Sequence, residues 1–168
     1  MRKMLASATT TFVLLAAAGA AQAQQGATFE ARSLTPEAAL KAALAAQAKC
    51  RAGGYQAAVA VVDRAGVPLV MLRDRFAGPH TVQTALDKAY TAVTFKISTT
   101  ELEVVSRPTG TMGGLRLLPR VVVIGGGLQI NAAGSQVGGI GVSGAPGGDA
   151  DEACAKAGVA AIGDDLEL

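Results

Sequence analysis

The chain has 168 residues, of which 50% are hydrophobic but only 4% aromatic, and its formal net charge is +2. This length predicts one domain with room for one hydrophobic core. Two of the 15 basic residues, Arg2 and Lys3, lie in a stretch that we expect to be removed, and the remaining 13 balance the 13 acidic residues. A neutral chain with few aromatic rings lacks the basic surface and the stacking platforms of general nucleic-acid binders.

The first residues are typical of a secretory signal peptide. A basic start is followed by an apolar run from Phe12 to Ala21 and by the small-x-small sequence Ala21-Gln22-Ala23. The run is too short to cross a bilayer. We therefore expect a signal peptide over residues 1–23 and a single domain over residues 24–168. We also expect a periplasmic or secreted location, with no membrane insertion after cleavage.

Helix signals and strand signals follow in turn. Thr35 precedes a proline and an acid, which is a typical helix start, and Gly53-Gly54 ends the helix predicted over residues 36–52. The β-branched segments 56–62 and 67–72 are joined by four residues that include a glycine. Strands joined by so short a turn must be antiparallel, so the pair predicts a hairpin.

Apolar residues at helical spacing predict a second helix from Thr81 to about Lys96, with Gln83, Asp87 and Lys88 off its apolar stripe. A short helix fits residues 98–105, with Ser98 or Thr99 as its cap. A loop rich in glycine and proline is expected over residues 107–119.

The last third of the chain predicts strands over residues 121–124 and 136–143, with a short strand at 128–130 as a further element. A capping box from Asp149 to Glu152 opens a final helix that runs to about Ile162, followed by a frayed acidic tail. Short loops between strands and helices at both ends predict an α+β fold with a mainly antiparallel sheet.

Two cysteines, Cys50 and Cys154, lie on the first and last predicted helices. Export favours a disulfide between them, but two small buried helix residues explain them as well. Two thiols and one histidine are too few for a structural zinc site.

The segment Gly139–Gly144 satisfies the G-x-G-x-x-G pattern of dinucleotide-binding loops. That interpretation requires a helix and then another strand with an acid about 20 residues on, and the chain ends too soon to supply them. We interpret the match as accidental. No serine lies in a nucleophile-elbow context either, so a hydrolase is not predicted.

His80 is the only histidine and follows a Gly-Pro turn at the start of the second helix. A neutral imidazole there can ligate a transition metal or haem iron, act as a general acid or base, or simply cap the helix and face solvent. Arg73 and Arg75 lie nearby and can hold carboxylates bidentately. Met71 and Met112 are possible second iron ligands, although methionine is more often a packing residue.

Four segments carry a family resemblance: AVAVVDRAGVPLVMLRDRFAGP, ALDKAYTAVTFK, VVVIGGGLQI and VGGIGVSGAPGGDADEACAKAGVAAI. Together they resemble the GlcG/HbpS family, which is related to the C-terminal domain of PduO-type proteins, from about Leu34 to Ile162. The resemblance implies a profilin-like three-layer fold with a five-stranded antiparallel sheet between helices. It also implies homo-oligomers and, in several members, binding of haem or a related tetrapyrrole.

On this basis we expect an exported, non-catalytic haem-binding protein with His80 as axial iron ligand. Arginines are expected to pair with the haem propionates: Arg73, Arg75 or Arg107. Apolar side chains are expected to line the ring: Phe76 and Met112. One alternative is a binder or enzyme for a small hydroxy acid or aldehyde, in which the arginines hold a carboxylate and His80 moves a proton. The other is an oligomeric accessory protein without a ligand.

Overall fold

The computed structural model describes residues 27–167, so the predicted signal peptide lies outside the described residues. The chain divides into two units, Met1–Glu30 and Ala31–Leu168, and the second holds every helix and strand that the structure describes. None of the helices within residues 27–167 has the length and apolar character needed to span a bilayer.

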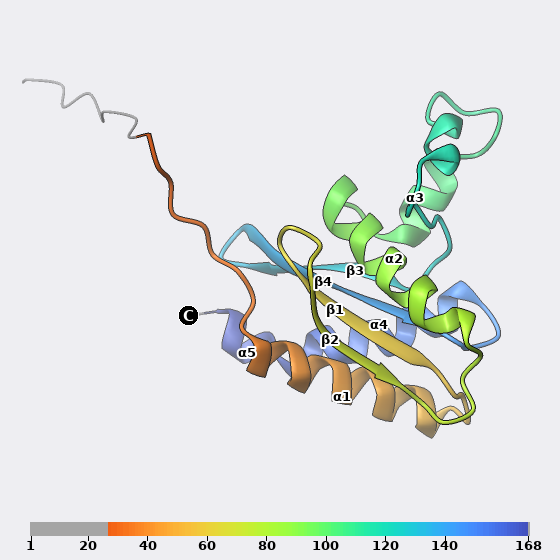
Figure 1. Ribbon diagram of the computed structural model, residues 1–168, viewed down its shortest axis with the longest axis horizontal. Helices are drawn as coiled ribbons and strands as arrows, with labels where there is room; N and C mark the ends of the chain where they lie inside the picture. The colour runs from red at the N-terminus through yellow and green to blue at the C-terminus, as the bar shows by residue number, and fades with distance from the viewer. Residues whose placement is uncertain (1–26, 168) are drawn as a thin grey trace, which may run out of the picture. The chain divides into compact units, whose positions relative to one another are not determined.

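The second unit is an α+β domain, as predicted (Figure 1). Its elements follow in the order α1 (Pro36–Ala52), β1 (Ala58–Asp63), β2 (Pro68–Arg73), α2 (His80–Phe95), α3 (Thr99–Val105), the 3-10 helix η1 (Gly113–Leu117), β3 (Gly127–Ala132), β4 (Ser135–Ser143), α4 (Gly148–Ala161) and α5 (Gly163–Leu166). The strands pair in the order β2-β1-β4-β3, and every pairing is antiparallel.

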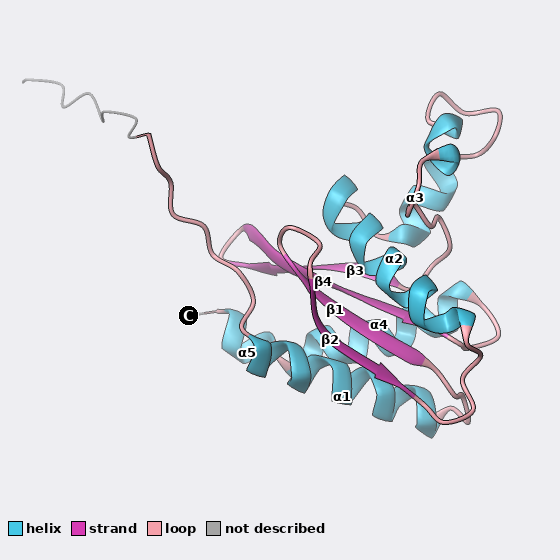
Figure 2. Cartoon of the chain, viewed as in Figure 1, coloured by secondary structure: helices cyan, strands magenta, loops and turns pink. Residues whose placement is uncertain are grey.

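Helices cover both faces of this sheet, which makes three layers (Figure 2). The central strand β1 is buried on both sides because its small and β-branched residues alternate between the two faces. Val59 and Val61 join the core beneath α1 and α4. Ala58 and Ala60 pack against Ala85 of α2 on the opposite face.

Glycines in β4 let α2 lie very close to the sheet, and this explains the G-x-G-x-x-G match. A Cβ on Gly141 would lie 2.7 Å from the Ala89 amide nitrogen and still closer to the Ala85 carbonyl oxygen. Gly139 faces the same helix, and Gly144 adopts φ +138°, which strongly favours glycine. The spacing therefore serves helix–sheet packing, and the interpretation of the nucleotide motif as accidental agrees with this role.

Residues 27–167 contain four strands where the family resemblance implied five, and the strand predicted over residues 121–124 is wrong. Residues Val121–Val123 pair with no other strand. The Val122 amide instead donates to the Thr91 hydroxyl of α2 at 3.0 Å. A helix side chain thus takes the backbone hydrogen bond that a neighbouring strand would have supplied.

A disulfide joins Cys50 of α1 to Cys154 of α4, with the two Cα atoms 5.4 Å apart. Both cysteines are buried in the core that these helices share with the sheet. Because the bridge spans 104 residues, it removes much freedom from the unfolded chain and contributes about 2–4 kcal/mol. Of the two interpretations that the sequence left open, the structure has the covalent one.

The predicted side-chain caps are confirmed at α1 and α3 and wrong at α4. The Thr35 hydroxyl accepts from Ala38 N–H at 3.3 Å, and Ser98 forms a capping box with Glu101. The predicted box at Asp149 is wrong, because α4 begins at Gly148 and no side chain caps it. The tail predicted to fray forms the short helix α5 instead.

The packing role of Gly141 can be tested by substitution. Gly141→Ala should lower the free energy of unfolding by about 1–3 kcal/mol or more, because the new methyl group would meet the backbone of α2. Gly163→Ala is the matched control, since its methyl group would enter open space and should change stability by about 0.5 kcal/mol or less. Urea unfolding measures both, and equal effects would contradict the packing argument.

Candidate functional site

A buried aspartate, Asp74, anchors the loop between β2 and α2. Asp74 is 3% exposed and accepts from Arg51 Nε at 2.7 Å. Its other carboxylate oxygen accepts from the Ala57 amide at 3.2 Å, and its own amide donates back to the Ala57 carbonyl at 3.0 Å. These bonds tie the loop to α1 and to the residue that precedes β1, so the residues that follow start from a rigid base.

His80 is the first residue of α2 and is exposed, one position earlier than the predicted helix start. Its ring lies back over Gly78, because a Cβ there would approach the imidazole Cε1 to 2.7 Å. Thr81 secures the turn by donating from its hydroxyl to the Gly78 carbonyl at 2.6 Å. Among residues 27–167 the imidazole makes no hydrogen bond or ion pair, so both ring nitrogens are available.

The imidazole borders a cavity of about 630 Å³ that opens between the start of α2 and the loop before α4. Its other lining residues come from four parts of the chain. The rim carries Phe76 and Ile124, which are 79% and 52% exposed. The wall includes Thr84 of α2 and residues 143–148. The structure therefore brings two of the predicted site residues, His80 and Phe76, to one cavity.

A buried ion pair forms the floor of this cavity. Lys88 of α2 is 1% exposed, and its ammonium donates to Asp151 Oδ2 at 2.8 Å and to the Val142 carbonyl at 2.9 Å. Asp151 also accepts from the Ala145 amide at 2.9 Å. Burial raises the pKa of Asp151, and the bonds from Lys88 and the loop amides oppose this rise.

Sequence reasoning missed this pair. Lys88 was placed off the apolar stripe of its helix, yet the structure buries it beside Ala85, Ala89 and Ala92. Positions 85, 88, 89 and 92 follow the helical i, i+3, i+4, i+7 spacing, which was the signal that could have found it. Asp151 was assigned to the polar start of the last helix, and nothing local marks it as buried.

One of the predicted arginines, Arg75, lines a neighbouring hollow of about 530 Å³ that shares Gln56 and Phe76 with the first. Arg75 and Arg51 line it, and Arg51 is already paired with Asp74 at 2.5 Å. Arg73 is exposed and donates from its guanidinium to the Ala77 carbonyl, which holds the loop. Arg75 is therefore the predicted arginine best placed for a ligand carboxylate beside Phe76.

The remaining predicted residues lie elsewhere. Arg107 and Met112 belong to the segment between α3 and β3, two elements that Figure 1 labels. Neither residue lines the cavity beside His80. Arg120 holds the end of this segment against α2, with its Nε 3.2 Å from Asp87 Oδ1 and its guanidinium 3.9 Å from the Tyr90 ring centroid. Met71 packs under α2 as a half-buried core residue.

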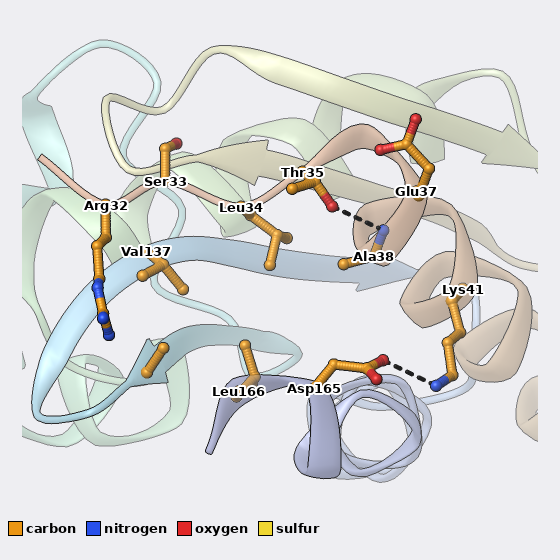
Figure 3. A pocket seen from close by; sticks show the side chains of 11 residues that line it. Arg32, Ser33, Leu34, Thr35, Glu37, Ala38, Lys41, Val137, Asp165 and Leu166 are labelled. Atoms are coloured by element: carbon orange, nitrogen blue, oxygen red, sulfur yellow. Dashed lines mark hydrogen bonds and ion pairs between the residues drawn. The ribbon is translucent and has the colours of Figure 1, made fainter. Parts of the chain in front are cut away.

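A third hollow, of about 490 Å³, lies between the start of α1, the start of β4 and α5 (Figure 3). Leu34, Val137 and Leu166 give it an apolar floor, and the Lys41–Asp165 ion pair at 2.8 Å crosses one end. Histidine and thiol groups are missing from its lining residues. It therefore offers a shape for apolar groups but no histidine or thiol for a haem iron.

The protein is thus a three-layer α+β domain with an exposed histidine beside a cavity whose volume is usual for small-ligand sites. Residues 34–160 match the family described as haem degrading protein HbpS-like, and the chain belongs to that family.

Known relatives agree with this assignment. HbpS is 41% identical, with a TM-score of 0.77 over 83% of this chain and 97% of that one. PduOC, whose structure was solved as a haem complex, is 31% identical in sequence. The two structures align with a TM-score of 0.73 over 77% of this chain and 95% of that one. An uncharacterized 15.0 kDa protein from the dhaT-dhaS intergenic region of Citrobacter freundii is 35% identical over 67% of this chain and 80% of its own.

We expect the buried ion pair between Lys88 and Asp151 to have a large effect on stability, with the contribution of each residue depending on the other. Lys88→Met should lower the free energy of unfolding by about 3–5 kcal/mol, because it leaves the Asp151 carboxylate buried without its partner. The double variant Lys88→Met/Asp151→Leu removes both charges and should regain much of that loss. Chemical denaturation of the wild type, the single variants Lys88→Met and Asp151→Leu, and the double variant measures the coupling. If the stability loss of the double variant equals the sum of the two single losses, the pair is not coupled.

Proposed function

We propose that this protein binds haem, that His80 is an axial ligand of the haem iron, and that binding takes place outside the cytoplasm without a catalytic step. The observation that carries the proposal is the exposed imidazole of His80, which has no partner among residues 27–167 and borders a cavity beside Phe76. Membership of the HbpS-like family and the likeness to haem-bound PduOC support it.

The residues present fit a haem group. The cavity volume of about 630 Å³ lies within the range of about 300–1,000 Å³ that is usual for cofactor sites. Phe76 and Ile124 expose apolar surface at its rim, which suits the faces of a tetrapyrrole. Bound haem would supply an iron centre with redox and ligand-exchange chemistry. The protein would contribute the nitrogen ligand, the apolar contacts and a cation, Arg75, for a propionate.

Two further features support export and assembly. The Cys50–Cys154 disulfide fits an oxidising compartment, which agrees with a signal peptide over residues 1–23. We also propose a homo-oligomer, because the segment around α3 and η1 exposes several large apolar side chains. They are Val104, Val105, Met112, Leu117 and Leu118.

Hemin titration tests the iron ligand. Wild-type apo protein should develop the shifted Soret band of a nitrogen-bound haem, and His80→Ala should lose that shift because the imidazole is gone. Free imidazole added to His80→Ala should restore it. Gln83→Ala, an exposed residue of the same helix that does not line the cavity, is the control. An unchanged Soret band in His80→Ala would remove the ligand assignment.

A second titration separates the arginines. Arg75→Gln should weaken hemin binding about tenfold, because a charge-assisted hydrogen bond to a propionate is lost. Arg107→Gln should leave the affinity unchanged, since Arg107 lies away from the cavity and carries the same charge. Equal losses in both variants would point to general electrostatic attraction in place of a contact at Arg75.

A further inference from the structure

The ammonium of Lys88 has one donor to spare. Lysine carries three N–H donors, and Lys88 uses two of them, on Asp151 and on the Val142 carbonyl. Its side chain is 2% exposed, so bulk water does not readily satisfy the third. Lys88 also lines the cavity below His80, and an acceptor that enters the cavity can therefore take this donor.

A second set of donors opens into the same cavity. The 14-residue helix α4 begins at Gly148, and its cap residue Gly147 has no side chain with which to satisfy the first turn. In the described part of the chain, the amides of Gly148, Asp149 and Ala150 have no acceptor. Gly147 and Gly148 line the cavity together with Lys88. The uncapped helix end directs N–H groups and the positive end of the helix dipole toward the space that the ammonium borders.

We propose that Lys88 and the N-terminus of α4 form a carboxylate-binding subsite on the floor of the cavity. The charges of Lys88 and Asp151 offset each other, so the net attraction comes from the unused donors and the helix end. Asp149 lies in the first turn of the helix and opposes an anion, which favours a singly charged carboxylate over a phosphate.

Two sources can supply such a group, a haem propionate or a small free carboxylate. The first deepens the haem function proposed above and rests on it, whereas the second does not depend on haem. The two are distinguished by titrating the full protein with hemin, with the dimethyl ester of hemin, and with sodium propionate. Amide shifts of Gly147 and Gly148, followed by NMR, report on the floor of the cavity in each case.

If the carboxylate is a haem propionate, hemin should shift the amide signals of Gly147 and Gly148. The dimethyl ester of hemin should bind about tenfold more weakly, because its esterified propionates carry no negative charge to accept charge-assisted hydrogen bonds. A free-acid source predicts that propionate shifts the same amides with saturation, even if hemin fails to bind at all. If neither hemin nor propionate shifts them, the subsite is overturned, and this result leaves the His80 titration as a separate test of haem binding.

A pair of variants at Asp149 avoids the folding cost of changing Lys88. Asp149→Ala removes the opposing charge and should tighten carboxylate binding. Asp149→Pro removes the same charge and also one amide donor, at a first-turn position where helices tolerate proline. Circular dichroism checks that both fold. Asp149→Pro should bind the carboxylate about tenfold more weakly than Asp149→Ala, and equal affinities would exclude the helix amides from the subsite.

Discussion

The ion pair between Lys88 and Asp151 is the interaction on which the rest of the site depends. It joins α2 to α4 across the end of β4, through the carboxylate at 2.8 Å and the Val142 carbonyl at 2.9 Å. Both charges are buried, so each needs the other, and this need holds the three elements in one arrangement. The cavity lies directly above the pair. The floor of the site is therefore polar and rigid, while its rim, with Phe76, is apolar and exposed.

The sheet reaches this arrangement through small residues. Glycines in β4 bring the backbone of α2 close to the sheet, and the long Lys88 side chain reaches the carboxylate of Asp151 in α4 beside the end of β4. Gly126 lies beside this path, since a Cβ there would be 3.1 Å from the Lys88 ammonium nitrogen. A helix held away by larger side chains would leave that charge without its partner.

The mouth and the floor of the cavity differ in chemistry, so this one cavity offers two kinds of contact. His80 and Phe76 lie at the mouth and offer a metal ligand and an aromatic face. Lys88 and the uncapped start of α4 lie at the floor and offer hydrogen-bond donors. The haem group that we propose has an iron centre, an apolar ring and anionic side groups, and each would have a counterpart among these contacts. The proposed combination of contacts agrees with the membership of this chain in the HbpS-like family.

The order of most helices and strands and the α+β class could be predicted from the amino-acid sequence alone, because these depend on local periodicity, on caps such as Thr35 and on turn residues. The family could be predicted as well, from the resemblance of four sequence segments. The sequence also marked His80, since a lone histidine after a Gly-Pro turn is visible without a structure. Only the tertiary structure decided that residues 121–124 bond to α2 and pair with no strand, and that Lys88 meets Asp151. Both depend on partners 31 and 63 residues away along the chain, and no local pattern encodes such a distant contact.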